Sequence, residues 1–148
     1  MKPVVIEEYV EPGLVRFVSR HFPFLGPEST RAAEAAECAG EQSGFEEYSD
    51  LLLANQQRDR NAGGFADAKL VALARFSGLD DGEFESCLLA GKYVANVEQD
   101  LADAGELGVH GTPSVFINGE FISPPDIETV RAALDRALAA SAETSGAN

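Results

Sequence analysis

Two cysteines, Cys38 and Cys87, are the residues of this chain best suited to redox chemistry. They lie far apart in the sequence, so they do not form the Cys-x-x-Cys pattern of two cooperating thiols. Two cysteines are also too few ligands for a zinc site. Two interpretations therefore remain open at this point: a pair of buried free thiols, or a structural disulfide that joins two helices.

The other candidate groups are a proline, two histidines and several carboxylates. Pro113 follows Thr112 directly before an apolar segment that is typical of a strand, and proline donates nothing to a sheet ladder, so this bond is a candidate for the uncommon cis form. His21 and His110 are too few for a metal cluster, and His21 is interpreted as a solvated or hydrogen-bonded residue. Adjacent acidic pairs, which helix starts and exposed faces explain more simply than catalysis, occur at Glu7-Glu8, Glu46-Glu47 and Asp80-Asp81.

The composition restricts the function classes. The 148 residues include 11 basic and 25 acidic side chains, and the formal net charge of −14 makes nucleic acid an unfavourable partner. No apolar run approaches the roughly 20 residues that a membrane-spanning helix needs, and the start of the chain does not resemble a secretory signal. The length fits one domain with a single core.

The elements that must position these residues are mostly helices, with one strand near the start of the chain and two short strands before the last helix. Hydrophobic periodicity, turn residues and capping residues predict the end of a helix at residues 4–10, a strand at 14–22, helices at 30–39, 45–56, 66–76, 80–89 and 92–104, two short strands within 114–123, and a helix from Asp126. Asn118-Gly119 between the two short strands is a strong hairpin signal. The tail, residues 141–148, is predicted to be disordered.

The segment Gly108-Val-His-Gly-Thr-Pro-Ser-Val-Phe-Ile-Asn-Gly119 resembles the DsbA-like thioredoxin family of thiol-disulfide oxidoreductases. The resemblance extends over about residues 4–140 through Phe22-Pro-Phe-Leu-Gly-Pro-Glu-Ser, Ala35-Ala-Glu-Cys-Ala-Gly-Glu-Gln and Phe84-Glu-Ser-Cys-Leu. It implies a single α/β domain over residues 1–148, with a thioredoxin-like fold and a helical insertion at about residues 28–104. Ser123-Pro124-Pro125 departs from the family pattern, which has a glycine after the second strand of the hairpin.

The resemblance also implies what this chain lacks. The chain matches the family from about Pro3, in the later part of the active-site helix, so we expect the first, central strand and the Cys-x-x-Cys segment to lie upstream of Met1. We therefore expect a truncated member that is inactive by itself. Alternatives are a DsbA-fold isomerase or glutathione-using relative, or a non-catalytic remnant that binds peptides.

The family pattern assigns roles to residues of this chain. Gly111, Thr112 and Pro113 would form the substrate-binding loop with a cis proline, Cys38 and Cys87 would form a structural disulfide, and His110 could tune a nearby thiolate. No residue of the chain is predicted to be catalytic, and no cofactor or metal is expected. The implied partners are protein thiols and disulfides, with a dimer as one way to cover unpaired strand edges. The implied location is extracytoplasmic, where disulfides persist.

Overall fold

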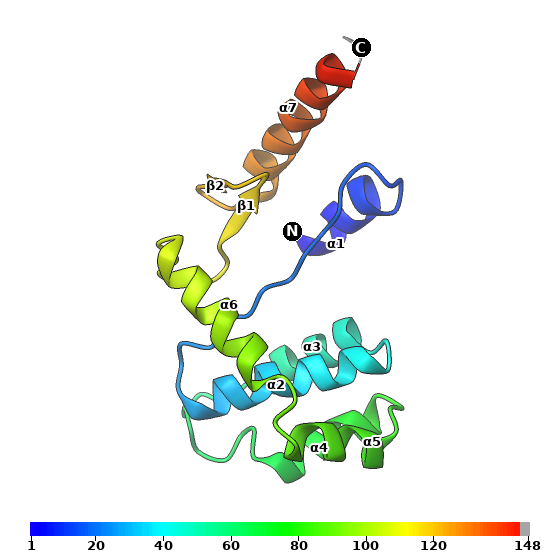
Figure 1. Cartoon of the computed structure of the whole chain (residues 1–148), viewed down its shortest axis with the longest axis vertical. Helices are drawn as coiled ribbons and strands as arrows, with labels where there is room; N and C mark the ends of the chain where they lie inside the picture. Colours follow the sequence, from blue (N-terminus) through cyan, green and yellow to red (C-terminus); the bar gives the residue numbers. More distant parts are fainter. Residues whose placement is uncertain (146–148) are drawn as a thin grey trace. The chain divides into compact units, whose positions relative to one another are not determined.

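The computed structural model describes residues 1–145 and divides them into two compact units (Figure 1). The first, here called the sheet unit, combines Met1–Ser19 with the chain from Val109 onward, and the second, the helical unit, comprises Arg20–Gly108. Each unit has its own hydrophobic core. The chain therefore leaves the sheet unit, builds a helical unit and returns.

A β-hairpin and two helical segments make up the sheet unit. Its elements are α1 (Lys2–Val5), η1 (Ile6–Val10), β1 (Val115–Ile117), β2 (Glu120–Ile122) and α7 (Ile127–Ser145). The strands pair antiparallel, with Phe116 opposite Phe121. The turn residues Asn118 and Gly119 have φ angles of 50° and 86°, as a two-residue hairpin turn of the I′ type requires.

The core of the sheet unit forms where one face of the hairpin meets α7 and the N-terminal helix. Its buried side chains are Val5, Tyr9, Ile122, Val130, Ala133 and Leu134. The Tyr9 hydroxyl donates a 2.9 Å hydrogen bond to Asp135, and the Arg131 guanidinium donates to the Glu8 carboxylate. Tyr9 and Glu8 therefore join the start of the chain to α7 by polar contacts as well as by packing.

Residues 6–10 form a π-helix. The Glu11 N–H donates to the Ile6 carbonyl at 2.9 Å, and the Leu14 N–H donates to the Tyr9 carbonyl at 3.0 Å, which are contacts five residues apart. The predicted strand at residues 14–22 is absent from the structure, which has irregular backbone from Val15 to His21. A strand needs a neighbouring strand for its hydrogen bonds, and no described residue provides one here.

The helical unit contains α2 (Pro27–Glu41), α3 (Phe45–Ala54), α4 (Asp67–Phe76), α5 (Asp81–Leu89) and α6 (Val94–Glu106). Its first helix begins at Pro27, three residues before the predicted start at residue 30, because Gly26 is the N-cap and Pro27 suits the first helical position. Four alanines, Ala32, Ala35, Ala36 and Ala39, form the buried face of α2, and their small side chains let neighbouring helices approach closely.

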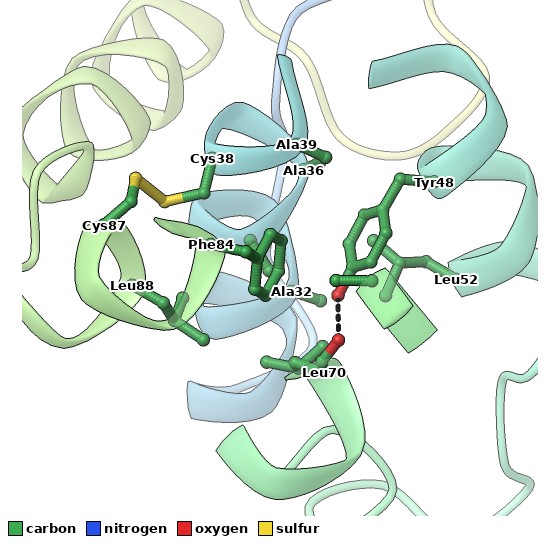
Figure 2. Packing of buried hydrophobic residues seen from close by; sticks show 12 residues of the cluster. Ala32, Ala36, Cys38, Ala39, Tyr48, Leu52, Leu70, Phe84, Cys87 and Leu88 are labelled. Atoms are coloured by element: carbon green, nitrogen blue, oxygen red, sulfur yellow. Dashed lines mark hydrogen bonds between the residues drawn. A yellow bond between two sulfur atoms is a disulfide. The ribbon is translucent and has the colours of Figure 1, made fainter. Parts of the chain in front are cut away.

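Large side chains fill the space around α2 (Figure 2). The rings of Tyr48 and Phe84 lie 5.2 Å apart between their centroids, and both side chains are fully buried. The Tyr48 hydroxyl donates a 2.9 Å hydrogen bond to the Leu70 carbonyl, and burial raises the pKa of this phenol. The core of the helical unit is therefore apolar, with its one deeply buried hydroxyl satisfied.

The last helix, α7, extends further than the sequence indicates. It continues through Ser145, whereas residues 141–148 are predicted to be disordered. Alanines at 139, 140 and 142 explain the continuation, because alanine has the highest helix propensity. Residues 146–148, the end of that predicted tail, lie outside the described residues.

Candidate functional site: an exposed proline loop and a buried disulfide

The loop that precedes β1 contains the predicted substrate-binding residues. The Thr112–Pro113 peptide bond is cis, and both residues are exposed. The Ser114 hydroxyl donates a 2.8 Å hydrogen bond to the Gly111 carbonyl, which closes the loop on itself. The structure thus brings Gly111, Thr112 and Pro113 together on the surface of the sheet unit, at the start of a strand.

β1 offers an open edge next to this loop. Within residues 1–145 it pairs with β2 alone, so its other edge has no strand partner. In a hairpin with a two-residue turn, the residues flanking the turn form the hydrogen-bonded pair, so the Phe116/Phe121 pair is a non-hydrogen-bonded one. The backbone N–H and C=O of Phe116 consequently face the open edge. Such groups can accept an extended polypeptide as an added strand.

The two histidines lie in different units and have different surroundings. His110 is exposed in the loop before Gly111. His21 belongs to the helical unit, where its Nε2 lies 2.7 Å from a Glu37 carboxylate oxygen and its backbone N–H donates to Asp100 at 2.9 Å. His21 is thus a hydrogen-bonded residue that fastens the start of the helical unit to α2 and α6. No group of the kind needed to bind a metal occurs in the described part of the chain.

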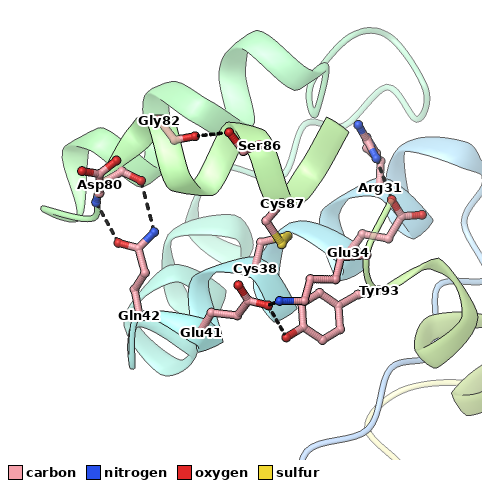
Figure 3. The surroundings of a disulfide bond; sticks show 11 residues. Arg31, Glu34, Cys38, Glu41, Gln42, Asp80, Gly82, Ser86, Cys87 and Tyr93 are labelled. Carbon is pink, nitrogen blue, oxygen red and sulfur yellow. Dashed lines mark hydrogen bonds and ion pairs between the residues drawn. A yellow bond between two sulfur atoms is a disulfide. The ribbon is translucent and has the colours of Figure 1, made fainter. Parts of the chain in front are cut away.

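Cys38 of α2 and Cys87 of α5 form a disulfide (Figure 3). The sulfur atoms are 2.02 Å apart and the Cα atoms 5.9 Å apart. Cys38 is 2% exposed and Cys87 8% exposed, so the bond is closed to a large substrate. Because the sequence contains two cysteines and both are in this bond, the chain has no free thiol in this structure.

Ion pairs surround the disulfide on α2. One turn before Cys38, Glu34 is 7% exposed and pairs with Arg31 at 2.7 Å. One turn after it, Glu41 accepts hydrogen bonds from Lys92 and from the Tyr93 hydroxyl, and the Tyr93 bond is 2.7 Å long. The bond to Glu41 raises the pKa of Tyr93 to about 12. Glu34 and Glu41 on either side of Cys38 thus each have a partner of their own.

Three carboxylates of the acidic pairs have structural roles. Glu8 pairs with Arg131, and Asp80 caps α5 by accepting a 2.9 Å hydrogen bond from the Glu83 N–H. Asp81 accepts from Arg75, which lowers the pKa of the carboxyl group. These three carboxylates hold helices in place.

Sequence reasoning missed one surface feature, a groove between the hairpin turn and α7. Arg136 and Glu120 are the charged residues that line it. The sequence gives little signal for it, because the alanines of its floor suit any helix. None of the helices described in the structure is long and apolar enough to cross a membrane.

The thioredoxin family model matches residues 2–136. Among curated relatives, the Na(+)/H(+) antiporter NhaA 3 of Salinispora tropica is 38% identical over 141 residues, which are 93% of this chain and 21% of the antiporter. The probable disulfide bond formation protein D of Bacillus cereus is 30% identical over 139 residues, 92% of this chain and 64% of the relative. The chain thus spans less than two thirds of the length of these relatives.

The crystal structure of oxidised BdbD from Bacillus subtilis is similar, with a TM-score of 0.79 at 19% sequence identity. The similarity covers 92% of this chain and 75% of BdbD, and it confirms the predicted thioredoxin-like fold. With the family match over most of its length, this chain belongs to the thioredoxin family, in its DsbA-like group.

Proposed function

We propose that this chain forms the substrate-binding part of a DsbA-like thiol-disulfide oxidoreductase and does not carry out thiol-disulfide exchange by itself. The observation that carries the proposal is the loop Gly111–Pro113, in which Thr112 and Pro113 are exposed directly before β1. The identity to a probable disulfide bond formation protein D supports the choice of reaction.

The substrate of this site is an extended segment of a protein that contains thiols or a disulfide. An extended chain can pair its backbone with that of an exposed segment such as this loop. The exposed Phe121, which lies opposite Phe116 on the face away from α7, adds apolar surface for such a segment. The oxidised Cys38–Cys87 pair supports a location outside the cytoplasm, in a compartment where disulfides persist.

Exchange itself needs a thiolate that attacks a sulfur atom and a second thiol that resolves the mixed disulfide. Both cysteines of the chain are oxidised and buried, so neither meets this requirement. We therefore expect the 148-residue chain to be inactive in insulin reduction and in the refolding of a scrambled disulfide protein. Turnover by the pure chain that disappears in a Cys38→Ser or Cys87→Ser variant would contradict this assignment.

Binding can be tested separately by titrating the ¹⁵N-labelled chain with a reduced, unfolded polypeptide. Saturable shifts are expected for amides of residues 110–117. A Thr112→Arg variant should lose them, because Thr112 is exposed in the loop and the larger side chain blocks the approach. Ala139→Arg, on an exposed position of α7, is the matched control and should bind normally. Shifts confined to other surfaces would refute the site.

A second candidate function is peptide binding without any redox chemistry. The absence of a free thiol in this structure favours it. Thiol-disulfide exchange by a longer protein that contains this chain separates the two functions. Insulin reduction by that protein would support the redox role, whereas peptide binding without insulin reduction would support the general peptide-binding role.

A further inference from the structure

A groove of about 460 Å³ lies between the tip of the hairpin and α7, here called the α7 groove. Ile117 and the turn form one wall, and α7 forms the other. It is a different surface from the Gly111–Pro113 loop, because the loop precedes β1 whereas the hairpin turn follows it. Both surfaces belong to the sheet unit, so the groove is formed within one compact body.

The floor of the α7 groove is apolar and made of small side chains. Ala133, Ala137 and Ala140 follow one another at spacings of four and three residues, which places them on one face of the helix. Ala133 is 4% exposed beneath the hairpin, and the next alanines continue the same face beyond it. Methyl groups in place of larger side chains leave room for a ligand of limited size.

Two opposite charges line the same groove. Arg136 comes from α7 and Glu120 from the first residue of β2. Within residues 1–145, neither side chain makes an ion pair or hydrogen bond, with the other or with a third residue. Arg131, which lies little more than one turn earlier on α7, is by contrast paired with Glu8. The groove therefore presents a cation and an anion that both remain available.

We propose that the α7 groove binds a short zwitterionic peptide with an apolar side chain. Arg136 binds its carboxylate, Glu120 binds its ammonium group, and the alanine floor contacts the side chain. Carboxylates suit the forked donors of a guanidinium, and charge-assisted hydrogen bonds are the stronger ones. The chain has a net charge of −14, which disfavours an anionic ligand but not one whose charges cancel. This site does not depend on the proposed redox function.

The test is an NMR titration of the whole ¹⁵N-labelled chain with the dipeptide leucyl-leucine. Saturable shifts are expected for amides of residues 117–120 and 133–141. The N-acetylated and C-amidated forms of the dipeptide should each bind about tenfold more weakly, because each lacks one charge-assisted contact. Linear shifts without saturation would overturn the proposal, and so would saturable shifts confined to residues 110–114, which would instead support the substrate loop.

Variants test whether Arg136 and Glu120 bind the two charged groups of the peptide. Arg136→Gln and Glu120→Gln should each weaken binding about tenfold. Arg16→Gln and Glu128→Gln remove the same charges at exposed positions outside the groove and should leave binding unchanged. Equal binding by all four variants would overturn the proposal. Since both groove residues are exposed, unchanged circular dichroism will show that any loss of binding is not a loss of fold.

Discussion

Reduction of the Cys38–Cys87 disulfide should remove a large part of the stability of the helical unit. The bond closes a loop with a sequence separation of 49. Loop-closure entropy for this separation gives about 4 kcal/mol at 25 °C. The two thiols would remain packed as small apolar groups after reduction, so the loss comes mainly from the unfolded chain becoming less restricted. Against a typical total of about 5–15 kcal/mol, this is a decisive fraction.

Urea unfolding followed by circular dichroism measures the effect. With a slope of roughly 2 kcal/mol per M, the midpoint should fall by roughly 2 M on complete reduction. A Cys38→Ala/Cys87→Ala variant should unfold near the reduced protein and should not respond to reductant. Amide exchange in α2 and α5 should rise more than in α7, because the disulfide joins α2 to α5 and does not involve α7.

A reduced protein that keeps the urea midpoint of the oxidised one would refute this stabilising effect of the disulfide. Alkylation and mass spectrometry must first show that both thiols are free in the reduced sample. An unchanged midpoint under that condition would mean that the unfolded helical unit is already restricted without the bond. An unchanged midpoint would also mean that the disulfide does not stabilise the helical unit.

Three further changes should alter stability by different physical routes, each measured by urea unfolding. Tyr48→Phe removes the buried hydrogen bond to the Leu70 carbonyl, which keeps its place within α4, and should cost about 1 kcal/mol, so an unchanged midpoint would contradict the hydrogen bond. Asp80→Ala should cost about 1 kcal/mol through the lost cap on the Glu83 N–H, whereas Asp80→Asn should retain most of it. Backbone N–H donors hold the pKa of Glu28 below its usual value of 4.5, so its stabilisation is present above pH 4.5 and is lost as the pH falls through the lowered pKa. Glu28→Gln should therefore be less stable than wild type at pH 7 and should approach it in acid, and a constant difference would refute this.

Features that depend on near neighbours in the sequence were predicted well. Asn118 and Gly119 accept positive φ angles at low cost, so the hairpin and its register follow from a few adjacent residues. Asp80 caps α5 for a similarly local reason, because its side chain reaches an N–H three residues ahead. In both cases the interaction that decides the structure lies within the segment itself.

The strand predicted at residues 14–22 was wrong because a strand forms only when a second segment supplies its hydrogen-bond partners. The β-branched and aromatic side chains there favour an extended backbone, but they do not supply the partner that turns it into a strand. Within the described residues the N–H groups of Leu14 and Val15 both donate to the Tyr9 carbonyl instead. The backbone thus takes the nearest acceptor when no neighbouring strand is present.

The candidate site was predictable in part. The proline loop and the cysteine pair have residue types and sequence contexts that stand out, and the resemblance to a family supplied their roles. The α7 groove has no such signal, because Ala133 and Ala137 are equally suited to any helix. The properties of the groove depend on where the hairpin tip lies over α7, and on the lack of a partner for Arg136 among residues 1–145. Both are features of the tertiary structure, which the local sequence pattern of α7 does not predict.

The contact between the N-terminal helix and α7 is another tertiary feature that the local sequence pattern does not predict. Tyr9 and Asp135 are separated by 126 positions, and their hydrogen bond joins two parts of the sheet unit between which the helical unit is inserted in the sequence. Hydrophobic spacing indicates that Val5 and Tyr9 lie on a buried face and that α7 has an apolar face. It does not indicate that these two faces contact each other. Closing so long a loop is entropically costly, and the cost rises only with the logarithm of its length. A helical unit that folds around its own core and disulfide would hold the ends of the intervening chain in place, so that much of this cost is met before Tyr9 reaches α7.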